Sequence, residues 1–174
     1  MAINFDALPG SNPSGAVVPN GTYYGTIKNP EMRVPKPKED GSIGKPYLNF
    51  KLLLQNAKSE AVGSIYDMLS DSDHEIPRYK IRRFIEALAL PITGAFELRD
   101  LAKIIDGKRL IVDIAEDKRS TTPKSQVDTF SGDIYYPISE AANIFGNTAG
   151  VTGQDATPDT PFVVSDTPQT PSEY

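Results

Sequence analysis

The sequence predicts a mainly β fold, a five-stranded barrel with a helical insertion between the third and fourth strands. Three segments with the alternating pattern of half-buried strands come first. Two segments with helical spacing follow, and two further strand-like segments come after them. A barrel is the economical arrangement for five such strands, because closing the sheet removes its exposed edges.

The first three strands are expected at residues 22–28, 47–55 and 61–68. The second has the clearest pattern, with four apolar side chains on one face: Leu48, Phe50, Leu52 and Leu54. In the first strand, Tyr24 and Lys28 share the face opposite Tyr23 and Ile27. Residues 29–46 contain several prolines and glycines, so they predict a long loop between the first two strands.

The helical insertion is predicted from apolar residues at positions i, i+3, i+4 and i+7, namely Ile81, Phe84, Ile85 and Leu88. Pro91 ends this helix, and Asp73 and Glu75 precede it at the end where the helix dipole favours acids. A shorter segment, 98–105, has the same spacing, and Asp106-Gly107 predicts a turn after it.

The last two strands are expected at residues 109–114 and 130–138. Leu110, Val112 and Ile114 alternate with more polar neighbours in the fourth strand. Pro137 limits the fifth to an edge or a strand end, since proline has no N–H for the ladder.

Both ends of the chain are predicted to lie outside the barrel. Residues 1–20 are expected to be a flexible arm, residues 21–146 the folded domain, and residues 147–174 a disordered Pro/Thr-rich tail with four Thr-Pro pairs. The formal net charge of the whole chain is −5. All 18 bases and 16 of the acids lie within residues 1–124, however, whereas residues 125–174 hold seven acids and no base. The pattern indicates a mildly basic body with an acidic tail.

Composition argues against most enzyme chemistry. The chain has no cysteine and a single histidine, His74, which removes disulfides, thiolate metal sites and cysteine nucleophiles. The acids around His74 lack the glycine of a calcium loop and are explained by the helix that follows. No apolar run reaches the length of a membrane span. We therefore expect a soluble, cytoplasmic, non-enzymatic protein without metal or cofactor.

Two basic, aromatic-flanked loops are the candidate binding elements. The hairpin of the first two strands has six bases against three acids, and the loop after the fourth strand adds three more bases. Cations beside flat aromatic rings suit a single nucleic-acid strand, because rings stack on bases and cations neutralise phosphates. The candidate residues are Tyr24, Lys28, Arg33, Lys36, Lys38, Lys45, Tyr47, Lys51, Lys118, Arg119, Lys124, Phe130 and Tyr135.

The chain resembles the small OB-fold single-stranded DNA-binding proteins of bacteriophages. The resemblance rests on five segments and covers about residues 20–137; the segments are 21–27, 47–52, 65–69, 82–88 and 98–112. It implies a five-stranded OB-fold barrel whose loops between strands 1 and 2 and between strands 4 and 5 flank the oligonucleotide groove. It also implies a protein that coats and protects single strands during replication or recombination, sequence-tolerantly, in the cytoplasm of a host cell.

The same resemblance implies that the acidic tail recruits replication or recombination proteins. The residues expected to do so are Asp155, Asp159, Phe162, Asp166, Glu173 and Tyr174. Two other functions remain open at this point. The barrel is also compatible with a phage accessory protein that binds protein, and with a small RNA-binding module, because stacking and backbone contacts do not exclude ribose.

Overall fold

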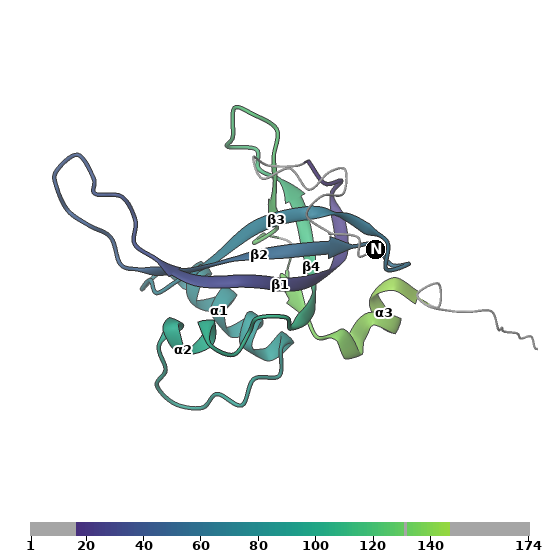
Figure 1. Cartoon of the computed structure of the whole chain (residues 1–174). Coiled ribbons are helices and arrows are strands. Elements are labelled where there is room, and N and C mark those ends of the chain that lie inside the picture. Colours follow the sequence, from purple (N-terminus) through teal and green to yellow (C-terminus); the bar gives the residue numbers. More distant parts are fainter. Residues whose placement is uncertain (1–16, 131, 147–174) are drawn as a thin grey trace, which may run out of the picture.

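The computed structural model describes residues 17–130 and 132–146. Their strands form an antiparallel sheet that curls into a nearly closed barrel (Figure 1). β1 (Gly21–Arg33) lies between β2 (Tyr47–Gln55) and β4 (Arg109–Glu116). β3 (Ala61–Ser70) pairs with β2. β5 (Ser125–Val127) and β6 (Tyr135–Tyr136) both pair with β4. This arrangement confirms the predicted mainly β barrel.

The helical insertion lies between β3 and β4, as predicted. It consists of α1 (Glu75–Ala87) and α2 (Leu98–Ala102), which Figure 1 shows together on one side of the sheet. α1 packs against β3 and β6. A 3-10 turn, η2 (Ile138–Glu140), and a short helix, α3 (Ala141–Phe145), follow β6.

The core is built from the inward faces of the strands and from α1. The Phe84 ring of α1 lies 5.2 Å from that of Phe50 on β2 and 5.3 Å from that of Tyr135 on β6. All three side chains are fully buried. Gly25 on β1 faces the same interior, where an added Cβ would come within 3.3 Å of Leu52. The barrel is therefore narrow at this point and filled by side chains.

β1 is longer than the sequence predicts, because pairing continues beyond Pro30. The register with β2 shifts between Lys28 and Glu31, and Asn29 has a left-handed φ of 53° there. A β-bulge at this point accommodates Pro30, which cannot donate to the ladder. The predicted loop 29–46 is thereby shortened to residues 34–46.

The fifth strand is where the prediction from sequence is wrong. Instead of one strand over 130–138, two short strands occupy the same edge of β4, namely β5 and β6. The chain between them turns at Gly132 and Ile134, both with positive φ, and Ile134 is buried. Ile134 is buried although it lies in a loop, so an apolar residue at this position does not mark a strand.

The folded part also begins earlier than residue 21. Val18 is buried, and its N–H donates to Ser125 Oγ at 2.6 Å while its carbonyl accepts from the same hydroxyl at 2.9 Å. Asn20 Oδ1 accepts the N–H of Glu116 at 2.9 Å. Residues 17–20 are thus held against β4 and β5. Residues 1–16 and the predicted tail at 147–174 lie outside the described residues.

Candidate nucleic-acid interface

The outer face of β1, β2 and β3 places the predicted hairpin residues in register. Three cross-strand rows follow from the pairing: Arg33–Tyr47–Ser70, Glu31–Asn49–Met68 and Lys28–Lys51–Tyr66. Directly paired residues share a face of the sheet. We call this set the row face.

Tyr66 and Met68 are the most exposed large apolar side chains of the row face. Tyr66 is 54% exposed and Met68 is 50% exposed, while Tyr47 is half-buried. Two rings and a polarizable thioether are thus available to flat ligands on adjacent strands. Tyr66 and Met68 were not among the predicted site residues. The signal that could have found them is the alternation in the third strand, which puts both opposite the buried Ile65 and Leu69.

Cations lie beside these rings. Lys28 and Lys51 are paired with each other across β1 and β2, and Lys51 is paired with Tyr66 across β2 and β3. Arg33 ends β1, where its Nε donates to Glu31 Oε1 at 2.7 Å. This hydrogen bond and the Glu31 charge raise the pKa of Arg33, with smaller contributions from Tyr47 and Tyr66. The row face therefore combines stacking surfaces with positive charge.

The β1–β2 loop, residues 34–46, projects well beyond the barrel (Figure 1). Its tip is closed by Lys38, whose N–H donates to the Ser42 carbonyl at 2.9 Å, and by Asp40, which accepts from the Ser42 N–H and hydroxyl. These bonds from Ser42 lower the pKa of Asp40. Lys36, Lys38 and Lys45, which are predicted to contact phosphates, are exposed along the loop.

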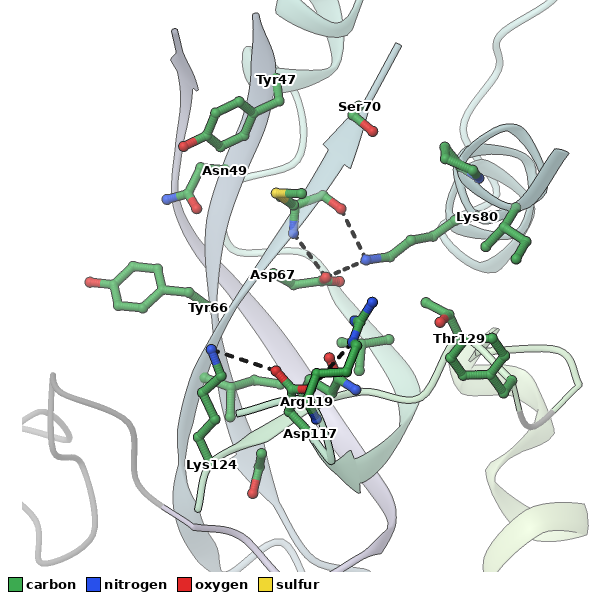
Figure 2. Close-up of a pocket in the computed structure, with 18 of the residues that line it drawn as sticks. Tyr47, Asn49, Tyr66, Asp67, Ser70, Lys80, Asp117, Arg119, Lys124 and Thr129 are labelled. Atoms are coloured by element: carbon green, nitrogen blue, oxygen red, sulfur yellow. Dashed lines mark hydrogen bonds and ion pairs between the residues drawn. The ribbon is translucent and has the colours of Figure 1, made fainter. Parts of the chain in front are cut away.

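A groove of about 750 Å³ continues from the row face across the seam between β3 and β5. Its walls include Tyr66, Met68, Arg119 and Phe130. Figure 2 shows Arg119 and Lys124 of the β4–β5 loop converging on Asp117, each 3.6 Å from a carboxylate oxygen. The Arg119 N–H also donates to Asp117 at 3.0 Å, and this bond is the main cause of a lowered Asp117 pKa. Phe130 is 75% exposed.

A buried ion pair forms the inner end of this groove. Lys80 of α1 is paired with Asp67 of β3 and donates to the Met68 carbonyl at 2.9 Å (Figure 2). Asp67 also accepts the Met68 N–H at 2.8 Å and the hydroxyl of Tyr135. These contacts join β3, α1 and β6 and occupy the backbone groups of Met68, so they close part of the β3 edge.

Two predicted site residues are buried in the structure. Tyr135 is fully buried against Phe84, where a nucleobase cannot reach its ring. Tyr24 is only 8% exposed, because Phe145 and Arg109 lie against its ring. The remaining predicted residues fall into three groups, the first of which is Lys36, Lys38 and Lys45 on the β1–β2 loop. Lys28, Arg33, Tyr47 and Lys51 lie on the row face, whereas Lys118, Arg119, Lys124 and Phe130 lie at or beside the groove.

Burial of the tyrosines near β6 predicts a loss of stability at alkaline pH. Burial, followed by the nearby Asp67 charge and hydrogen bond, raises the pKa of Tyr135 well above its usual value. Burial and a hydrogen bond to Asp113 raise the pKa of Tyr136 to about 12. Above about pH 10 the unfolded chain releases protons that the folded chain retains, so the free energy of unfolding should fall with rising pH.

Urea denaturation between pH 8 and 11 measures this fall. Tyr135→Phe should unfold more easily at pH 8, because it loses the bond to Asp67, yet lose less further stability between pH 9 and 11. A pH dependence identical to that of the unchanged protein would contradict the assigned cause.

Comparison with known proteins adds no relative: no protein-family model matches the chain, and a search of curated proteins gives no significant match. Within residues 17–130 and 132–146, no group of three or more metal-ligating side chains is placed to hold an ion. No helix in this part of the chain is long and apolar enough to cross a membrane.

Proposed function

We propose that the protein binds single-stranded DNA on the row face and in the adjoining groove, with little dependence on base sequence. The observation that carries the proposal is the exposure of Tyr66 and Met68 beside Tyr47, with Lys28, Lys51 and Arg33 in the same rows. Every base has a π-face, so stacking on such side chains tolerates sequence. A duplex hides those faces, which favours single strands.

The two basic loops would add phosphate contacts on either side of the stacking surface. The β1–β2 loop offers exposed lysines, and the β4–β5 loop offers Lys118 with Arg119 and Lys124. In the β4–β5 loop, Asp117 already partners Arg119 and Lys124. A phosphate would therefore compete with a carboxylate there, which moderates affinity.

The biological role proposed with this activity is to coat and protect single strands in phage replication or recombination. It rests on the resemblance of five sequence segments to phage single-stranded DNA-binding proteins. A protein-binding barrel is the second candidate. Val34 and Ile43 favour it, because both are more than half exposed on the β1–β2 loop and have no part in phosphate binding.

Fluorescence anisotropy with labelled oligo-dT, the corresponding duplex and oligo-U, each at two salt concentrations, tests the proposed function. We expect tighter binding to oligo-dT than to duplex. The affinity should fall with salt at a log–log slope of about −0.7 per neutralised phosphate. Absence of oligo-dT binding at low salt would favour the protein-binding barrel. Preference for oligo-U would identify an RNA-binding module instead.

Charge reversal on the β1–β2 loop should weaken binding through phosphate contacts alone. For Lys36→Glu with Lys38→Glu, we expect a lower oligo-dT affinity and a salt slope smaller by about 1.4, the value for two lost contacts. Lys58→Glu, on the exposed β2–β3 turn, is the matched control and should leave the slope nearly unchanged. An unchanged slope in the loop variant would remove this loop from the interface.

The acidic residues beyond position 150 are proposed to compete with DNA and to recruit partner proteins. They include Asp155, Asp159, Asp166 and Glu173, with no base among them. A tethered acidic segment acts at high effective concentration even when its intrinsic affinity is weak. Truncation after Gly150 should therefore raise oligo-dT affinity, most at low salt. Equal or weaker binding by the truncated protein at low ionic strength would contradict the competition.

A further inference from the structure

Tyr24 lies on the same outer surface as the row face, and its burial has a local cause. Tyr24 pairs with Gln55 of β2, four residues along β1 from the Lys28–Lys51 pair. At the rise of a β-strand, four residues span about 13 Å. On the other side, Tyr24 pairs with Ile111 of β4. Tyr24 and Ile111 are the two buried apolar residues that lie outside the barrel core in the described chain.

The cover over Tyr24 comes from α3. The Phe145 ring lies 4.8 Å from the Tyr24 ring, tilted by 44°. α3 has five residues, none of them buried, and it ends at Gly146 with a positive φ. A helix this short is not stable by itself, so its position depends on contacts such as this one. In Figure 1, α3 lies beside the barrel rather than within it.

A cation lies next to the covered ring. The Arg109 guanidinium is 5.1 Å from the centre of the Tyr24 ring, and Arg109 Nη2 donates to Gln55 Oε1 at 3.2 Å. Arg109 is exposed and pairs with Thr26 across β1 and β4. The Phe145 ring thus covers the Tyr24 ring where a nucleobase would stack. The Arg109 guanidinium lies beside the Tyr24 ring, where it would meet the phosphate of that nucleotide.

We propose that Tyr24 and Arg109 form a further nucleobase subsite, which Phe145 occupies while no nucleic acid is bound. A bound strand that continues along β1 from the row face displaces Phe145 and stacks a base on Tyr24, with Arg109 near its phosphate. The subsite rests on the proposed function, since it extends the same strand path. Unlike binding on the row face, binding at this subsite requires α3 to move. That movement lengthens the segment of DNA that the protein covers.

Phe145→Trp provides a direct reporter, because the chain has no other tryptophan. Saturating oligo-dT should shift the emission of the introduced tryptophan to longer wavelength and increase its quenching by acrylamide. A short oligo-dT that occupies only the row face should leave the emission unchanged. Anisotropy with labelled oligo-dT, measured on the same full-length protein, reports binding independently.

Phe145→Ala tests the energetic consequence. Removing the occupant should raise affinity for long oligo-dT by about fivefold, the lower end of what one stacked base contributes. Adding Tyr24→Ala should abolish this gain. Adding Arg109→Gln to Phe145→Ala should reduce this gain in affinity. Because Arg109 is exposed, this second test remains available if Tyr24→Ala prevents folding. Asn143→Ala, on an exposed position of the same helix, is the matched control.

The outcomes separate the subsite from the proposed function. If oligo-dT fails to bind the unchanged protein, both are wrong. If oligo-dT binds while the introduced tryptophan keeps its emission, or if Phe145→Ala binds no tighter, only the subsite is wrong. A Phe145→Ala variant that unfolds at a lower temperature with unchanged affinity would show that α3 is a structural cover.

Discussion

Replacing Tyr66 with alanine should reduce the affinity for oligo-dT by about 1–3 kcal/mol, and Tyr47→Ala should cost about as much. Tyr66 is more than half exposed and Tyr47 is half-buried at the end of β2, so the barrel core does not depend on either ring. The variant with both substitutions should bind oligo-dT more weakly than either single variant, because it removes both rings of the row face.

Anisotropy titrations measure this loss, and circular dichroism checks that the variants remain folded. Tyr79→Ala is the matched control, because Tyr79 is exposed on α1 and its hydroxyl donates to Asp133 at 3.2 Å, away from the row face. We expect normal binding for this variant. If Tyr66→Ala and Tyr47→Ala together bind oligo-dT as tightly as the unchanged protein, base stacking on the row face is wrong.

Phe84→Ala should lower the free energy of unfolding by about 3–5 kcal/mol. Phe84 is fully buried between Phe50 of β2 and Tyr135 of β6, so truncation leaves a cavity where α1 meets the barrel. Neither neighbouring ring can fill this space without leaving its own packing. The expected loss is a large part of the stability of a domain this size.

Urea denaturation of Phe84→Ala and Phe130→Ala gives a matched comparison of the same substitution. Phe130 is 75% exposed at the groove, so its truncation should change the free energy of unfolding by no more than about 0.5 kcal/mol. Equal losses in the two variants would contradict the assignment of Phe84 to the core and of Phe130 to the surface.

Local patterns were sufficient for the elements whose burial is decided within one strand or helix. The alternation from Tyr47 to Gln55 predicted β2 at its observed bounds, and the spacing of Phe84 with Ile81 and Leu88 predicted α1. In both cases the apolar period matches the backbone period, so one face must be covered. The fifth strand lacked this consistency, and it is the element that the sequence misplaced.

The candidate site likewise contains residues that local patterns predict and residues that they do not. The outward face of β1 and β2 and the basic hairpin follow from alternation and charge alone, which is why Lys28, Tyr47 and Lys51 were predicted together. The third strand has a weaker alternating pattern, and its residues were not predicted to bind, although Tyr66 and Met68 carry the most exposed apolar surface of that face.

The sequence by itself determined which way each strand residue points, because successive side chains of a strand alternate between its two faces. Only the tertiary structure decided what meets the outward ones. Tyr24 and Tyr66 both point away from the core, yet Tyr24 is covered by Phe145, more than a hundred residues later in the chain, and Tyr66 is open. Likewise Asp67 is buried in β3 because Lys80 and Tyr135 reach it from α1 and β6. Such contacts depend on how distant segments pack, and no local period encodes them.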